Sequence, residues 1–129
     1  MQISIPKRLK TERPLGDIKA PWLTGRRTRW RVIEDWLVII DGEHYTVPAG
    51  YIFDGASIPW LLWAVFPPSY SPSWEASCFH DRAYSHWHPV MDKSFADQAF
   101  KAIMLEQGAK PWIAAIFYRA VSWFGKGGW

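Results

Sequence analysis

The chain has 129 residues, the size of one domain with a single hydrophobic core. Hydrophobic residues make up 49% of it and charged residues 21%, and a net charge of +3 is too small to predict a nucleic-acid-binding protein. The single cysteine, Cys78, excludes an intramolecular disulfide, and ten tryptophans are more than so small a domain is expected to bury completely.

The first half of the chain reads as strands. Residues 1–28 alternate proline, glycine and basic residues and predict an arm with one or two short strands. Residues 30–40 are rich in Val, Ile and Trp, Asp41-Gly42 is a hairpin signal, and residues 44–48 return as the second strand. We expect a small N-terminal antiparallel sheet.

The second half reads as helices. A short apolar helix is predicted over 58–66, followed by a helix over 72–86 that Ser71 caps. Asp92 or Ser94 begins the next helix, which ends near Gln107-Gly108, and the last helix covers 111–124. The prediction is therefore an α+β fold in one domain, 1–129, with residues 1–57 mainly strands and arm and residues 58–129 a cluster of about four helices.

The motif His80-Asp81-x-x-Tyr84 lies within the helix predicted over 72–86. His80 and Tyr84 share a helix face at i and i+4, while Asp81 points about 100° away. Asp97 lies on the following helix. If the two helices are antiparallel neighbours, we expect the side chains of His80 and Asp97 to approach within hydrogen-bonding distance, with Tyr84 beside them.

Four sequence features together resemble a protein family that is widespread in tailed bacteriophages and prophages. They are Val-Pro-Ala-Gly at 47–50, Asp-Gly-Ala-Ser-Ile-Pro at 54–59, the His-Asp motif at 80–84, and Ala96-Asp97 followed by an aromatic C-terminal helix. The resemblance covers about residues 45–129. It implies a phage or prophage source rather than a particular activity.

The His-Asp motif with a later aspartate is also similar, more distantly, to secretory and parvoviral phospholipases that cleave the sn-2 ester. That resemblance implies that His80 activates a water, that Asp97 and Tyr84 hold the imidazole, and that Asp81 binds Ca²⁺. Carbonyl groups of Asp54 and Gly55 complete the calcium shell in this scheme. The glycine-rich calcium loop of those enzymes is reduced here to Asp54-Gly55-Ala56.

Each of these residues also has a structural interpretation. His80 and Asp97 can form a buried hydrogen bond that joins two helices without any catalysis. Ser94-x-x-Asp97 matches a capping box, which would explain the aspartate locally. His80, His86 and His88 do not have the spacing of a standard zinc site, and Cys78 among apolar neighbours predicts a buried, unreactive thiol.

The segment 112–124 is apolar on nearly every side. A central core helix is the favoured interpretation, over a helix that lies in a membrane interface or packs against another subunit. We also expect several of the indoles to form a patch that is covered only by a partner. The candidates for that patch are Trp60, Trp63, Trp112, Trp123 and Trp129.

Two functions of different classes follow. The first is a phage-encoded structural or accessory protein, associated with the virion or tail, that docks onto other phage proteins or onto itself through an aromatic surface. The second is a small hydrolase that cleaves a lipid ester or cell-envelope bond with His80 and Asp97, with calcium as the implied cofactor. In both cases we expect synthesis in the host cytoplasm and no nucleic-acid partner. We also expect no transmembrane segment, because no run of about 18 apolar residues is present.

Overall fold

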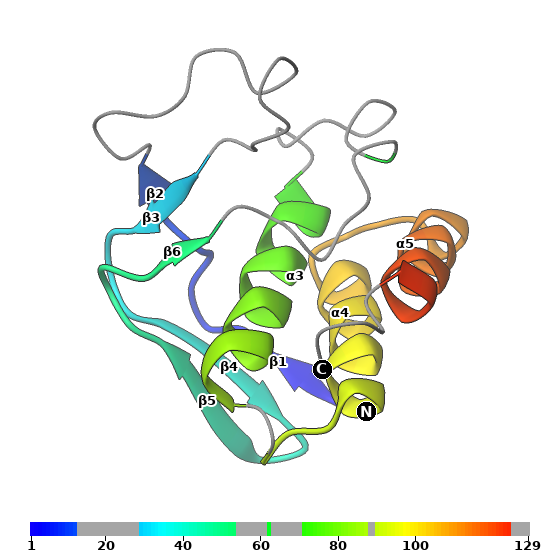
Figure 1. The fold of residues 1–129 in the computed structure, drawn as a ribbon, viewed down its shortest axis with the longest axis horizontal. Helices are drawn as coiled ribbons and strands as arrows, with labels where there is room; N and C mark the ends of the chain where they lie inside the picture. The colour runs from blue at the N-terminus through cyan, green and yellow to red at the C-terminus, as the bar shows by residue number, and fades with distance from the viewer. Residues whose placement is uncertain (13–28, 54–61, 63–70, 88–89, 125–129) are drawn as a thin grey trace.

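The computed structural model describes residues 1–12, 29–53, 62, 71–87 and 90–124 (Figure 1). Two three-stranded antiparallel sheets precede three α-helices, so the α+β prediction is confirmed. The first sheet has the order β1 (Ile3–Ser4), β4 (Trp36–Ile40), β5 (Glu43–Val47). The second has the order β2 (Thr11–Glu12), β3 (Trp30–Val32), β6 (Ile52–Phe53). The expectation of one sheet was wrong.

The β4–β5 hairpin is the element that the sequence predicted most directly. Asp41 and Gly42 have φ values of 49° and 85°, and two positive φ angles are what a two-residue hairpin turn with the native twist requires. Along β4, Trp36, Val38 and Ile40 are buried and the residues between them are less so. This period-2 pattern fixes which face of the hairpin covers the core.

The segment 30–40 does not form one strand, as the sequence suggested, but two strands in different sheets. The break contains Glu34 and Asp35, and Asp35 Oδ1 accepts a hydrogen bond from the Ala49 amide at 2.8 Å. The carbonyl of Val32 accepts from the Gly50 amide at 2.7 Å, which brings the residues before β6 alongside the end of β3. These contacts redirect the chain from one sheet to the other.

Three α-helices, α3 (Ser71–Arg82), α4 (Lys93–Glu106) and α5 (Pro111–Phe124), occur in the described residues, rather than about four. The helix expected over 58–66 lies outside the described residues except for Leu62, which packs against the core. The helix expected over 72–86 begins at Ser71 and passes at Ala83 into a π-helix, η1 (Ala83–Trp87). The predicted ends at Gln107-Gly108 and at Phe124 are confirmed.

The helices form a layer in which α4 lies between α3 and α5 (Figure 1). The other side of α3 faces the strands, and the buried residues of strands and helices join into one hydrophobic cluster. Trp36, Phe79, Phe100 and Phe117 are the largest apolar side chains that are fully buried in it. Residues of α3 and of α4, among them Phe79 and Phe100, therefore belong to the same core.

None of the helices in the described ranges is both long and apolar enough to cross a membrane.

Candidate functional site

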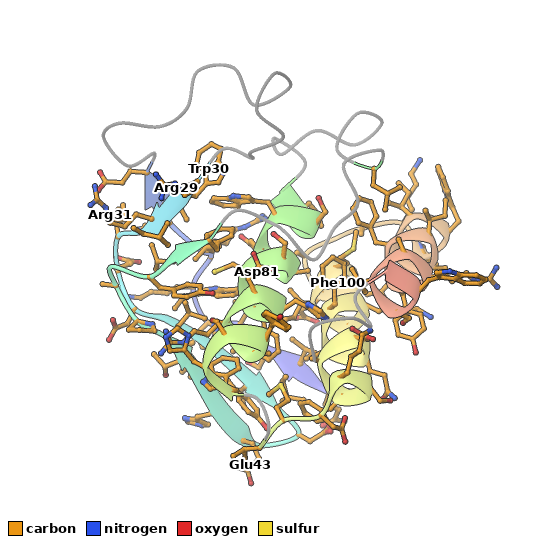
Figure 2. All side chains as sticks on the ribbon, in the orientation of Figure 1. Arg29, Trp30, Arg31, Glu43, Asp81 and Phe100 are labelled. Carbon is orange, nitrogen blue, oxygen red and sulfur yellow. The ribbon has the colours of Figure 1, made fainter. Side chains whose placement is uncertain are left out.

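His80 of α3 and Asp97 of α4 meet inside the helical layer. His80 Nε2 and Asp97 Oδ1 are 2.6 Å apart, and the residues are only 2% and 4% exposed. The ring of Phe100, one helical turn beyond Asp97, lies edge-on to the imidazole at 5.9 Å, and Figure 2 labels it on α4. The predicted approach of His80 and Asp97 is confirmed.

Lys93 is a third member of this cluster, and the sequence analysis missed it. Its Nζ lies 2.5 Å from Asp97 Oδ2, and it also donates to the carbonyls of Val121 and Ser122 at 3.0 and 3.3 Å. Those carbonyls belong to the last turn of α5, where a helix presents unpaired acceptors and the negative end of its dipole. His80, Asp97 and Lys93, here called the His–Asp–Lys cluster, thus join all three helices.

The electrostatics of the cluster keep Asp97 ionised. Burial alone would raise the pKa of Asp97, but the hydrogen bonds from His80 and Lys93 outweigh it, and the pKa is lowered. An ionised carboxylate only accepts hydrogen bonds, so His80 Nε2 carries the proton in this contact. In a neutral imidazole held in this way, Nδ1 is the nitrogen with a lone pair, and it is the one able to act as a base.

The capping-box interpretation of Asp97 is wrong. Asp92 is the N-cap of α4, and its Oδ1 accepts from the Phe95 amide at 2.7 Å. Ser94, the other proposed cap, instead accepts from Gln98 Nε2 at 3.2 Å. Asp97 is directed into the helical layer, where it contacts His80 of α3 and Lys93 of its own helix.

The other members of the predicted site are placed differently. Tyr84 lies in η1 and is 45% exposed, so its side chain reaches the surface whereas His80 is enclosed. Asp81 is 9% exposed and is labelled on α3 in Figure 2. Its negative charge helps to raise the pKa of Cys78 and of Tyr51, although burial is the larger cause for both. Asp81 therefore acts electrostatically on Cys78 and Tyr51.

Cys78 is completely buried and its pKa is raised well above the ordinary thiol value, first by burial and then by the charges of Asp81 and Glu75. The thiolate is the reactive form of cysteine, so this environment suppresses nucleophilic chemistry. The prediction that the thiol is buried is confirmed, and its low reactivity stays a prediction.

Helix α5 has two apolar faces, and only one of them is buried. Ile113, Ala114, Phe117 and Val121 face the core. On the outer side Trp112, Ile116 and Trp123 are 57%, 39% and 75% exposed. Their spacing of four and seven residues places these three side chains along one side of the helix. The expectation of a central core helix was wrong: α5 is an edge helix with an exposed aromatic row.

A sequence model of the family described as "Protein of unknown function (DUF1353)" matches residues 25–121. The chain belongs to this family. No curated protein and no solved structure matches the chain.

The DUF1353 match includes the three side chains of the His–Asp–Lys cluster and both strands of the β4–β5 hairpin. It ends inside α5, so Trp112 and Ile116 fall within the matched region and Trp123 lies two residues beyond it. The family description itself names no activity.

Calcium binding by this DUF1353 chain rests on three predicted ligands, of which only Asp81 belongs to the described residues. Asp54 and Gly55 lie outside them. Across the described parts of the chain, no three His, Cys, Asp or Glu side chains are grouped closely enough to hold a metal ion. The calcium ligand set therefore stays a prediction.

Proposed function

We propose that this protein is an accessory or structural protein of a tailed-phage particle that docks onto a partner protein through the outer face of α5. The observation that carries the proposal is the exposure of two indoles, Trp112 and Trp123, with Ile116 between them. The phage assignment is supported by the motif resemblance at residues 54–59 and 80–84. Synthesis in the host cytoplasm and later association with the virion or tail follow from this assignment.

The exposed row is not required to complete the core. The inner face of α5 already supplies Ile113, Phe117 and Val121 to the buried cluster. On the outer face, Trp112, Ile116 and Trp123 remain in contact with water, which costs free energy roughly in proportion to the exposed apolar area. Aromatic residues in such a row are the commonest energetic centres of protein–protein interfaces, which supports a docking role.

The chemistry of the row indicates the partner. Arg119 is exposed on the same helix between Ile116 and Trp123, and Lys110 is exposed at the start of α5. Taking about 250 Å² for a whole Trp side chain, the two indoles offer roughly 300 Å². A standard interface buries about 800 Å² on each partner, so the indoles form the centre of a larger footprint. The partner that matches this face is a protein whose surface has an apolar pocket for the indoles, surrounded by carboxylate groups that pair with the basic residues.

A particle-binding assay tests this proposal. Purified phage particles from a strain that encodes the protein are incubated with tagged wild-type chain, Trp112→Ala or Trp123→Ala, and bound chain is measured after sedimentation. We expect each substitution to weaken binding by roughly 30-fold, the effect of a hot-spot residue worth about 2 kcal/mol. Val90→Ala is the matched control, because Val90 is 97% exposed but lies between α3 and α4.

Two further measurements separate the possible partners. Sedimentation velocity of the chain alone detects self-association. If Trp123→Ala abolishes this self-association, the partner that docks on α5 is a second copy of the chain. Vesicles of phosphatidylcholine and phosphatidylglycerol should leave Trp emission unshifted, whereas a blue shift would indicate a membrane surface instead. A monomer that binds neither particles nor copies of itself contradicts the docking function.

A second function, ester hydrolysis, is favoured by one specific observation, the 2.6 Å contact between His80 and an ionised Asp97. A carboxylate that fixes the imidazole tautomer is a common arrangement for a general base that activates water. The substrate class is a lipid or cell-envelope ester, as the phospholipase resemblance implies. His80 is only 2% exposed, so a substrate reaches it only if the surrounding elements move. The indoles of α5 are already exposed, which favours docking over hydrolysis.

The hydrolase is tested with fluorogenic phospholipid vesicles, with calcium and with a chelator. Hydrolysis should fall by at least about 100-fold in His80→Asn, the smaller end of what a general base contributes. His44→Asn is the control, since His44 is exposed on β5 and far in sequence from the cluster. If wild type and His80→Asn release product at the same rate, the His–Asp–Lys cluster is structural only.

A further inference from the structure

A second histidine, His86, forms a hydroxyl–imidazole chain at the surface. Tyr51 Oη lies 3.1 Å from Ser85 Oγ, and Ser85 Oγ lies 2.6 Å from His86 Nδ1. Ser85 and His86 are exposed, in contrast to the buried His80. Neither the docking face nor the His–Asp–Lys cluster uses any of these three residues.

The direction of the hydrogen bonds follows from the chemistry of the groups. Burial raises the pKa of Tyr51 far above its ordinary range, with a smaller contribution from the charge of Asp81 and an opposing one from the Ser85 bond. Tyr51 is therefore a protonated phenol at any working pH. Ser85 Oγ also lies within hydrogen-bonding distance of the Arg82 carbonyl, at 3.5 Å. The contact with His86 Nδ1 is much shorter, at 2.6 Å, so when neutral His86 accepts there Ser85 donates its only proton to the imidazole, and Tyr51 donates to Ser85 Oγ.

The local backbone explains why Ser85 and His86 are presented together. They lie in η1, the π-helical turn that directly follows α3, so the two side chains project from one short turn.

The phenol of Tyr51 is fixed in place by its neighbours. Phe53 stacks on its ring at 6.4 Å, the Arg82 guanidinium lies over it at 5.0 Å, and His86 meets it edge-on at 5.7 Å. Trp87, the next residue of η1, packs against Tyr45 of β5 at 5.5 Å, which anchors η1 to the sheet. The phenol and the turn that carries Ser85 and His86 are thus packed against neighbouring side chains, which helps to orient the polar groups.

We propose that Ser85 is a nucleophile that takes an acyl group from a carboxylic ester, with His86 as its general base and Tyr51 as the hydrogen-bond donor that positions Ser85 Oγ. Ser85 Oγ forms a bond to the carbonyl carbon while its proton passes to His86 Nδ1. The ester C–O bond then breaks, and His86 returns the proton to the leaving alcohol. Water attacks the acyl carbon with the same base, releasing the carboxylic acid and restoring Ser85.

Labelling with a fluorophosphonate tests this assignment. Intact-protein mass spectrometry of the full chain should show one covalent adduct, and peptide mapping should place it on Ser85. Ser85→Ala should abolish the adduct, and His86→Ala should slow its formation by at least about 100-fold. Ser94→Ala is the matched control, because Ser94 is also an exposed helical serine with a side-chain hydrogen bond.

A second control replaces a histidine outside the proposed site. His44→Asn should label at the wild-type rate, since His44 is exposed on β5 and takes no part in the proposed step. Circular dichroism of Ser85→Ala confirms that the surface substitution leaves the fold intact. Absence of an adduct in the wild-type chain, or equal labelling of Ser85→Ala, overturns the proposal, and neither result bears on docking by α5.

Discussion

Replacing Lys93 by Met tests whether the His–Asp–Lys cluster holds the three helices together. The change keeps the length and apolar stem of the side chain but removes its charge. Asp97, 4% exposed, keeps His80 as a hydrogen-bond partner and loses its contact with the ammonium group. The carbonyls of Val121 and Ser122 lose a charged donor at the same time.

The expected cost can be estimated from these contacts. Removing one partner of a buried ion pair costs about 3–5 kcal/mol. The side chain of Lys93 is 18% exposed, so water replaces part of the lost interaction and the lower end applies, about 3 kcal/mol. For a domain of this size that corresponds to a fall in melting temperature of roughly 10 °C.

Lys101→Met is the matched control. Lys101 is also on α4, and its ammonium group lies 5.6 Å from the ring centre of Tyr118 on α5. That cation–π contact is worth about 0.5–1 kcal/mol, so the two variants should differ by about 2 kcal/mol in urea denaturation at pH 7. Equal losses for Lys93→Met and Lys101→Met would refute the claim that the buried carboxylate makes Lys93 special.

Two pH predictions follow from the carboxyl groups. The pKa of Asp97 is lowered in the folded chain, so the ionised carboxylate stabilises the fold above about pH 4, and this stabilisation is lost as the pH falls through the folded-state pKa. Wild type should therefore lose more free energy of unfolding than Asp97→Asn between pH 5 and 3. Parallel losses for the two proteins in urea denaturation would contradict this. Burial raises the pKa of Glu75, against the opposing effect of Arg8, so ionised Glu75 is unfavourable in the folded chain at neutral pH. Glu75→Gln should raise the melting temperature at pH 7 by an amount that shrinks toward pH 4, and a lower melting temperature at pH 7 would show that the bond to Arg8 dominates.

Local sequence signals predicted the parts of the fold that local chemistry determines. Asp41-Gly42 specified the hairpin turn because both residues tolerate positive φ, and the polar and glycine residues at the helix ends specified the ends of α4. The contact of His80 with Asp97 was predictable because the two helices are consecutive and antiparallel. Lys93 was within reach of the same reasoning, since Lys93 and Asp97 are four residues apart on one helix.

The features that sequence reasoning missed depend on contacts between distant residues. The break between β3 and β4 follows from a bond between Asp35 and the Ala49 amide, and nothing in the residues 30–40 themselves indicates it. Tyr51 and Ser85 are 34 positions apart and match no motif. For α5, an apolar sequence on all sides could not indicate which side faces the core, because the hydrophobic pattern is similar on both faces.

The position of Lys93 also determines how the docking proposal must be tested. Trp123 directly follows Ser122, whose carbonyl accepts from Lys93, so Lys93 contacts the turn that carries Trp123, the most exposed indole among the described residues. A substitution at Lys93 therefore alters both the buried cluster and the end of the docking face, and a loss of docking in Lys93→Met would have two explanations. Trp112 lies three turns earlier on α5, away from that last turn. If Trp112→Ala weakens particle binding while its stability stays within about 0.5 kcal/mol of wild type, the loss is assigned to the surface itself.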